Sequence, residues 1–405
     1  MSKFPSFPSR LPAKLLACEI GPNYIPKDAL GWWLNSANTE KHCQEYLSLG
    51  HAHWWVDSGR TGLTLLLSAL NLPGERVLLQ GYSCVVVPNA VRAAGMRPVV
   101  IDIEPNGFNL DLDVVEQQAR TGVRVVVVQH TYGIAVDMER LSRLRVKYDL
   151  LLIEDMAHAL GNRFNGRLLG TFGFGAVYSF GRDKVVSSGT GGLVVINQDT
   201  PEVRAKLENS WQKLPRMSRK RVFAQIYYLI VVTLLVRPFY HWQAGKVILL
   251  LSQKCGLIDP VFTRAERVGS AQTHRASQYS FFLKKILTGQ FKRLSKTQAH
   301  RLGLVSRYNA AFGTDYTYPL LRYPLVTTQS EKIARKLRRQ GAIVGTWYQK
   351  VFIPSDEAVW SLGIAKQDLP EIRKTVFRKV LNLPTHANIR GQDAQKIITT
   401  IIDNK

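Results

Sequence analysis

Acidic residues and cysteines are both scarce in this chain of 405 residues. It has 30 Asp and Glu against 54 Lys and Arg, and the net charge of +24 favours anionic partners. The four cysteines, Cys18, Cys43, Cys84 and Cys255, lie far apart, which is typical of reduced thiols in a cytosolic protein. No Cys and His residues recur at zinc-binding spacing and no nucleic-acid-binding module is recognisable, so we expect neither a metal site nor a nucleic-acid partner.

The N-terminus also lacks the apolar core and small-residue cleavage site of a signal peptide. From about residue 51, short apolar strands alternate with helices, which predicts crossover units and a mainly parallel sheet. The expected strands are 53–56, 76–79, 98–102, 123–128, 150–153 and 176–178. We therefore predict an α/β protein with an N-terminal arm (1–50), a large domain (51–200), a helical insert and linker (201–317) and a small C-terminal α+β domain (318–405).

The predicted insert contains an apolar segment, residues 222–251, that has two interpretations. Its first part, 222–236, runs for 15 residues between basic residues, which is fewer than the roughly 20 that a membrane-spanning helix requires. The segment is therefore either a buried or dimer-interface helix, or a helix or hairpin lodged in a membrane surface with its basic residues at the headgroups.

The most informative residue is Lys184, which follows the strand 176–178 and precedes a loop of small residues. Lysine forms Schiff bases with carbonyl groups. Asp155 and His158 follow the buried strand 150–153, and ligands gather at the carboxyl ends of strands in α/β sheets. A lysine paired with a carboxylate at that edge suggests pyridoxal 5′-phosphate (PLP), which needs a lysine for its aldehyde and an anion at its pyridinium nitrogen.

Other polar residues follow the remaining strands at the same predicted edge. Ser58, Gly59 and Arg60 begin a helix, where free backbone N–H groups and the helix dipole suit a phosphate. The other loops at this edge supply Tyr82, Cys84, His130 and Ser179. Each signal is weak alone, since such a turn is usually a simple helix cap, but their shared position predicts a site.

The chain resembles the DegT/DnrJ/StrS family of PLP-dependent sugar aminotransferases, which have the fold-type I (aspartate aminotransferase-like) architecture. The resemblance runs from about Gly31 to the C-terminus, with a gap near 205–265. The motifs that carry it are VDSGRTGL (56–63), GYSCVVVPNAV (81–91), QHTYG (129–133), IEDMAHALG (153–161), SFGRDK (179–184) and VLNLPTHANI (380–389).

The resemblance implies a role for each matching residue. Lys184 would bind the cofactor covalently and move a proton, Asp155 would pair with the pyridinium nitrogen, and His158 would lie beside the ring. The residues that would hold the phosphate are Gly59, Arg60 and Ser179. The implied reaction moves an amino group from an amino acid, usually glutamate, to a keto-sugar that is typically linked to a nucleotide diphosphate, for surface polysaccharide or glycan assembly. A homodimer is also implied.

The sequence departs from the family pattern at several positions. Cys84 stands where an aromatic residue usually stacks on the PLP ring, and Tyr82 is a candidate to compensate. The usual His-Pro is Gly181-Arg182, the usual Glu is Thr190, and the Asn-Tyr-Arg-like stretch is reduced to Thr273-His274-Arg275. Arg60 and Arg182 add positive charge that would replace some of the lost contacts.

Three functions remain open at this point. The first is a cytoplasmic nucleotide-sugar aminotransferase. The second is a PLP enzyme held peripherally at the inner face of the membrane through 222–251 and acting on a lipid-linked sugar. The third is a non-catalytic regulatory protein with the PLP fold, which the intact pair of Lys184 and Asp155 disfavours because such a protein could lose either residue.

Overall fold

The protein is described from a computed structural model. The described residues are 25–34, 39–47, 49–198, 200–239, 244–267, 276–340, 342, 344–345, 347–348, 350–354, 369–372 and 380–404.

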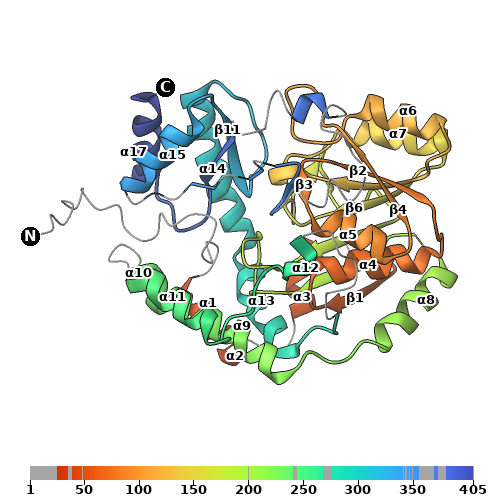
Figure 1. The fold of residues 1–405 in the computed structure, drawn as a ribbon, viewed down its shortest axis with the longest axis horizontal. Coiled ribbons are helices and arrows are strands. Elements are labelled where there is room, and N and C mark those ends of the chain that lie inside the picture. The colour runs from red at the N-terminus through yellow and green to blue at the C-terminus, as the bar shows by residue number, and fades with distance from the viewer. Residues whose placement is uncertain are drawn as a thin grey trace, which may run out of the picture.

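A seven-stranded sheet forms the centre of the larger part of the molecule (Figure 1). Its order is β1-β10-β9-β6-β5-β2-β4. The strands are β1 (Ala52–Val56), β2 (Arg76–Gln80), β4 (Arg97–Ile101), β5 (Val125–Gln129), β6 (Leu151–Asp155), β9 (Gly175–Ser179) and β10 (Gly192–Ile196). Only β10 runs antiparallel to its neighbours β1 and β9, which confirms the predicted mainly parallel sheet. The sequence analysis did not predict β10.

The sheet is buried on both faces, because successive apolar side chains of a strand point to opposite faces. In β5, Val125 and Val127 belong to one hydrophobic core, whereas Val126 and Val128 belong to the other. The first core is covered by α4 (Gly59–Leu70), α5 (Val86–Ala93) and α8 (Pro201–Gln212). The second is covered by α6 (Leu112–Arg120), α7 (Met138–Tyr148) and α13 (Phe281–Lys292).

A smaller α+β unit follows in the C-terminal part of the chain. It pairs β11 (Arg322–Val326) antiparallel with β13 (Val380–Pro384), and packs them against α14 (Leu294–Phe312), α15 (Ser330–Arg339) and α17 (Gly391–Ile402). A short parallel pair, β3 (Ser83–Cys84) with β12 (Phe352–Ile353), joins this C-terminal part to the large sheet domain. The predicted fold class is thereby confirmed, while the exact domain boundaries stay predictions.

The helical insert contains one long apolar helix. α9 (Arg219–Val231), a π-turn (Val232–Val236) and α10 (Arg237–Phe239) follow one another without a break. This helix of 21 residues has a mean hydropathy of 1.8 and is long and apolar enough to cross a membrane, but half of it is buried inside the protein. It exceeds the predicted 15-residue run at both ends. Ser218 caps it and Arg219–Arg221 form its first turn, and Arg237–Phe239 continue it beyond residue 236.

The remaining elements are short or peripheral. Before the sheet lie α1 (Pro26–Ala29), α2 (Gly31–Leu34) and α3 (Thr39–Cys43); within the large domain lie β7 (Arg163–Phe164), β8 (Arg167–Leu168) and a 3₁₀ turn (Thr131–Gly133). The insert continues with α11 (Ala244–Lys254) and α12 (Arg264–Arg267). Figure 1 shows α9, α10 and α11 on the side of the molecule away from α6 and α7.

Candidate active site

The predicted site residues gather at one edge of the sheet. β2, β5, β6 and β9 are parallel, and β1 has the same direction as β9 because both run antiparallel to β10. The carboxyl ends of these strands therefore meet at one edge, where ligands bind in open α/β sheets. The structure thus brings together loops from five strands, as the sequence analysis expected.

Lys184 and Asp155 lie at the carboxyl ends of two adjacent strands. β6 and β9 pair directly, with Asp155 opposite Val177, and Lys184 follows β9 in a turn. Burial raises the pKa of Asp155, while the N–H of Ala157, 3.0 Å from its Oδ1, and the charge of Lys184 lower it. Lys184 is therefore close enough to act electrostatically on Asp155.

His158 is held as a neutral imidazole beside this pair. Burial and the charges of Lys184 and Arg322 hold the pKa of His158 well below its usual value. Its Nδ1 accepts the N–H of Tyr132 at 3.2 Å, so the proton of the neutral ring is on Nε2. Nε2 lies 3.4 Å from the hydroxyl oxygen of Tyr348.

The start of α4 forms a cradle for an anion. Ser58 is the N-cap, and its Oγ accepts the N–H of Thr61 at 3.2 Å. Gly59 packs so closely on the end of β9 that a Cβ there would lie 3.1 Å from Cβ of Ser179. The twelve-residue helix directs its dipole at this spot. Ser58, Gly59 and Ser179 therefore come together as predicted.

Arg60 and Arg182, which were expected to replace lost cofactor contacts, both contact the helical insert, and their contacts with the cofactor stay predictions. Arg60 forms an ion pair with the almost fully buried Glu266 of α12. The guanidinium of Arg182 lies 4.1 Å from the ring centre of Tyr228 in α9 and donates to the carbonyl oxygen of Asp259 at 2.6 Å. These arginines fasten the insert to the loops that carry Gly59 and Lys184.

Tyr82 and Cys84 occupy different layers of the site. Tyr82 is fully buried, shares a hydrogen bond of 2.6 Å with the hydroxyl of Tyr132, and accepts the N–H of Tyr348 at 3.1 Å. Cys84 is only partly buried, and the charge of Lys184 partly offsets the rise that burial causes in its thiol pKa. Cys84 therefore lies near the lysine, whereas Tyr82 is part of an aromatic cluster.

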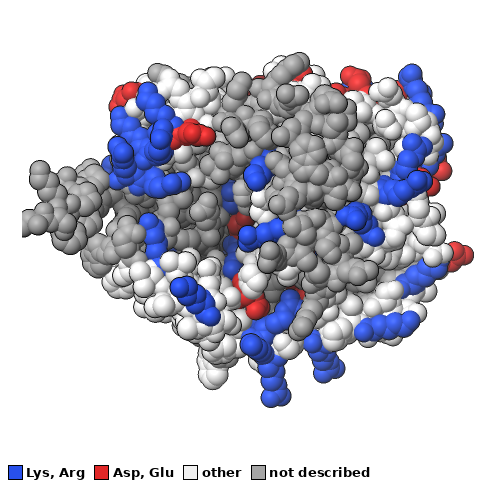
Figure 2. All heavy atoms as spheres, viewed as in Figure 1, with Lys and Arg blue, Asp and Glu red and all other residues white. Residues whose placement is uncertain are grey.

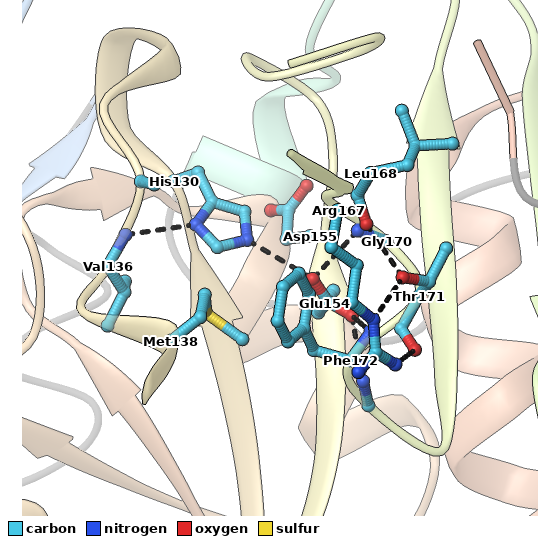
Figure 3. A network of polar contacts seen from close by, with 12 residues as sticks. His130, Val136, Met138, Glu154, Asp155, Arg167, Leu168, Gly170, Thr171 and Phe172 are labelled. Atoms are coloured by element: carbon cyan, nitrogen blue, oxygen red, sulfur yellow. Dashed lines mark hydrogen bonds and ion pairs between the residues drawn. The ribbon is translucent and has the colours of Figure 1, made fainter. Parts of the chain in front are cut away.

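His130 was predicted to contact the cofactor, and in the structure its ring nitrogens bind other parts of the protein, so the cofactor contact stays a prediction. It is fully buried, its Nδ1 accepts the N–H of Val136 at 3.2 Å, and its Nε2 lies 3.4 Å from Oε2 of Glu154 (Figure 3). Both ring nitrogens are thus engaged within the protein. His130 supports the site electrostatically, because its charge would lower the pKa of Asp155.

Glu154 organises the loop that precedes β9. Its Oε1 accepts N–H groups from Phe172 at 2.7 Å and Gly173 at 2.8 Å, and its Oε2 accepts from Gly170 at 2.8 Å (Figure 3). Glu154 and Asp155 are consecutive residues of one strand, so their side chains point to opposite faces of the sheet. One carboxylate therefore serves the fold, and the other is available to the site.

The sequence analysis missed Trp347 and Tyr348. The Trp347 ring centre lies 5.5 Å from that of His158 and 5.3 Å from Nζ of Lys184. Arg322 of β11 lies over the same ring at 3.3 Å and forms an ion pair of 3.3 Å with Asp183. Nothing in the sequence pattern links Trp347 to a lysine 163 positions earlier.

The remaining departures from the family pattern have two outcomes. Thr190 donates from Oγ1 to the carbonyl oxygen of Asp57 at 2.6 Å, so it joins the loop after Lys184 to the start of the phosphate turn. Thr273-His274-Arg275 lies outside the described residues. Among the residues that are described, no group of three or more His, Cys, Asp or Glu side chains is arranged to hold a metal ion.

The residues at this edge fit PLP on three structural observations. Lys184 and Asp155 lie within electrostatic range, as a cofactor with an aldehyde and a basic ring nitrogen requires. Because Gly59 has no side chain, the start of the helix approaches Ser179 closely, and the free N–H groups at a helix start suit a phosphate. A neutral His158 is available as a hydrogen-bond donor through Nε2.

Comparison with known proteins agrees with this arrangement. Residues 31–222 match the model of the DegT/DnrJ/EryC1/StrS aminotransferase family, which agrees with the resemblance of the sequence motifs to this family of PLP-dependent enzymes. The match ends where the long apolar helix of the insert begins. The predictions of family, enzyme class and cofactor are therefore confirmed.

Similar sequences carry different names. A GDP-perosamine synthase from Vibrio cholerae is 28% identical over 304 residues, covering 73% of this chain and 80% of the relative. A pleiotropic regulatory protein from Geobacillus stearothermophilus is 23% identical over 354 residues, covering 85% of this chain and 83% of the relative.

Solved structures show the same fold. Helicobacter pylori PseC, an aminotransferase involved in the biosynthesis of pseudoaminic acid, has a TM-score of 0.67 at 16% identity, covering 93% of this chain and 95% of its own. A PLP-form structure from Streptococcus pneumoniae has a TM-score of 0.68 at 17% identity, covering 95% of this chain and 97% of its own.

Replacing Glu154 tests its structural role. In Glu154→Ala, three buried N–H groups lose their acceptor, and we expect the free energy of unfolding to fall by about 3 kcal/mol. Glu139→Ala is the control, because Glu139 pairs with Arg143 on an exposed helix surface and should change stability by less than about 0.5 kcal/mol. Urea denaturation of both variants measures the difference. Equal urea midpoints for Glu154→Ala and Glu139→Ala would contradict the structural role of Glu154.

Asp155→Asn should separate stability from cofactor binding. Burial raises the folded-state pKa of Asp155 above its unfolded value, so its ionisation opposes folding as pH rises above about 3.8 in the protein without cofactor. The Asn variant should therefore unfold at pH 7 with a free energy equal to or above that of the wild type, while binding PLP more weakly. Asp113→Asn, at an exposed carboxylate, should leave PLP binding unchanged. Unaltered PLP affinity in Asp155→Asn would argue against the predicted pairing.

Proposed function

We propose that this aminotransferase moves an amino group from an amino acid, glutamate by preference, to a keto-sugar linked to a nucleotide. The observation that carries the proposal is the placement of Lys184 and Asp155 at the ends of two paired strands. The relative from Vibrio cholerae is named for a GDP-linked amino sugar, which supports a nucleotide-linked acceptor. The net charge of +24 suits such an anionic substrate. The product would serve surface polysaccharide or glycan assembly.

Each residue of the site has a separate role in the proposed reaction. When bound, PLP supplies an electron sink for the C–H bond that must break in the donor. Lys184 would hold the cofactor through Nζ and, once the donor amine has displaced it, would move the proton of the donor carbon at that nitrogen. Asp155 would keep the ring nitrogen protonated, and the N–H of Ala157 orients its carboxylate. Ser58, Gly59 and Ser179 would hold the phosphate at the start of α4.

The homodimer implied by the family resemblance is part of the same proposal. The family resemblance is its only support. Light scattering on the purified protein measures its molar mass. A mass of two chains is expected, and a monomer with full activity would contradict the proposed assembly.

Labelling tests the central assignment directly. Wild-type protein incubated with PLP should turn yellow, and borohydride should fix the cofactor to a peptide containing Lys184. Lys184→Ala should remain folded and colourless, whereas Lys147→Ala, at an exposed lysine, should behave as the wild type. Glutamate should bleach the yellow form, and keto-sugar nucleotides should restore it. If the wild type takes up no PLP, the proposed function is wrong.

A second candidate function places the same chemistry at a membrane surface. No Asp or Glu occurs between Arg219 and Lys254, a stretch with six Lys and Arg. The exposed apolar side chains of this stretch are Phe223, Leu234, Leu235, Phe239, Val247, Leu250 and Leu251. An apolar surface mixed with positive charge and lacking negative charge suits anionic lipid headgroups better than a second copy of itself. In Figure 2 the surface over α10 and α11 is mostly white, with isolated blue side chains.

The insert is fastened to the catalytic loops at three points. Arg221 forms an ion pair of 3.0 Å with Asp57, which directly precedes the N-cap of α4. Arg60 pairs with Glu266, and Arg182 contacts Tyr228 and Asp259. An insert held on a membrane would therefore hold the site beside it, and the acceptor would then be a lipid-linked sugar. The protein in this case is cytoplasmic and peripheral at the inner face of the membrane.

The third function, a regulatory protein without turnover, is favoured by one observation. The relative from Geobacillus stearothermophilus is named a pleiotropic regulatory protein. The labelling experiment separates this function from the first two, because a protein that binds PLP at Lys184 but is not bleached by any amino acid would be non-catalytic.

Vesicle flotation tests the membrane candidate. The protein should float with vesicles rich in phosphatidylglycerol and not with phosphatidylcholine vesicles. The double variant Leu250→Glu/Leu251→Glu should reduce the bound fraction at least about ten-fold, because it removes apolar area and adds negative charge.

Val146→Glu is the matched control, because Val146 is an exposed apolar residue on α7, outside the insert. This variant should float as the wild type does. A wild type that stays with neither kind of vesicle would remove the membrane candidate. If the double variant instead becomes monomeric while the wild type is a dimer, this face joins two copies.

A further inference from the structure

An aromatic pair, Trp347 and Tyr348, enters the site from the C-terminal part of the chain. The two rings lie 5.7 Å apart with an angle of 19° between their planes. Trp347 is nearly parallel to His158, at an angle of 16° and a distance of 5.5 Å. Tyr348 is almost fully buried, and this burial holds the pKa of its hydroxyl well above the usual value, with further increases from its electrostatic interactions with Cys84 and Asp155. The pair therefore lies among the residues of the candidate active site.

The backbone of the pair is fixed from two sides. Asn382 of β13 accepts the N–H of Trp347 at 2.6 Å and donates to its carbonyl oxygen at 2.7 Å. Asn382 is fully buried. The N–H of Tyr348 donates to the hydroxyl of Tyr82 at 3.1 Å. The backbone of the pair is therefore held by Asn382 of β13 and by Tyr82, which lies between β2 and β3.

The segment that carries the pair also pairs with the strand of Cys84. In β3 and β12, Ser83 lies opposite Phe352 and Cys84 opposite Ile353. The N–H of Ser83 donates to the carbonyl oxygen of Val351 at 3.1 Å. Chain topology thus brings the aromatic pair close to Cys84, the residue that stands where an aromatic residue was expected.

A planar cofactor between Asp155 and Lys184 needs an aromatic surface against one of its faces. Ring stacking stabilises such a group beyond the burial of its area, and a thiol cannot provide it. Trp347 lies 5.3 Å from Nζ of Lys184, and Tyr348 lies within 3.4 Å of Nε2 of His158 through its hydroxyl. We propose that the Trp347–Tyr348 pair forms the aromatic wall of the PLP site in this protein, in place of a residue at position 84. The proposal rests on the proposed function.

Titration of PLP into the protein tests the wall. Trp347→Ala and Tyr348→Ala should each raise the PLP dissociation constant about three- to ten-fold, the range expected for loss of one aromatic contact. Trp347→Phe and Tyr348→Phe keep a ring and should bind within about two-fold of the wild type. Adding Cys84→Phe to Trp347→Ala should recover part of the lost affinity, because it supplies a ring from the adjacent strand.

Tryptophan fluorescence gives a second readout that does not depend on activity. PLP should quench Trp347, so Trp347→Phe should lose part of the PLP-dependent quenching, whereas Trp33→Phe, at an exposed tryptophan, should keep it. Circular dichroism controls for folding of each variant.

The outcomes separate the wall from the function beneath it. If the wild type binds no PLP, the proposed function fails and the wall with it. If the wild type forms the Lys184 adduct but the alanine variants bind PLP as tightly as the wild type, the wall proposal alone is overturned. Tighter binding by the alanine variants would also overturn it, because the pair would then occupy the place of the cofactor.

Discussion

The adjacency of β6 and β9 is the constraint on which the rest of the site depends. Because the two strands run parallel and pair directly, Asp155 and the loop with Lys184 leave the sheet at the same edge. A buried carboxylate is unfavourable without a positive partner, and burial indeed raises the pKa of Asp155. The protein tolerates this carboxylate at the place where a cationic ring nitrogen would relieve it. The buried carboxylate of Asp155 lowers the stability of the protein without cofactor, and a bound cation would offset this loss.

Around this pair, the protein assigns neighbouring residues to opposite tasks. Glu154 holds the loop before β9 through three N–H groups, while Asp155 serves the site. Arg60 and Arg182 fasten the insert to the loops that carry Gly59 and Lys184. The insert is thereby rigidly connected to the catalytic loops, and its exposed apolar side chains face outward from them. This connection is the physical basis for considering a lipid-linked acceptor beside a soluble one.

The proposed aromatic wall comes from a different part of the chain than the position of Cys84. Cys84, in the large domain, has no ring to stack on a cofactor, whereas Trp347 and Tyr348 supply two rings from the C-terminal part. The wall then depends on Asn382 and on the pairing of β12 with β3. Cofactor binding in this chain would therefore couple the two parts of the molecule more closely than a wall built within the sheet domain.

The sequence by itself determined that apolar strands alternate with helices, and that Lys184, Asp155 and the turn at Ser58–Arg60 follow such strands, because each depends on local spacing that one stretch of chain displays. It could not decide what His130, Arg60, Tyr82 or Arg182 contact. A polar or aromatic residue after a strand gives the same sequence pattern whether its side chain faces a ligand or another segment of the protein. It also missed Trp347, whose position beside Lys184 arises from β12 pairing with β3 and from the clamp of Asn382. Contacts between residues of different elements have no signature in a single sequence, and only the tertiary structure decided them.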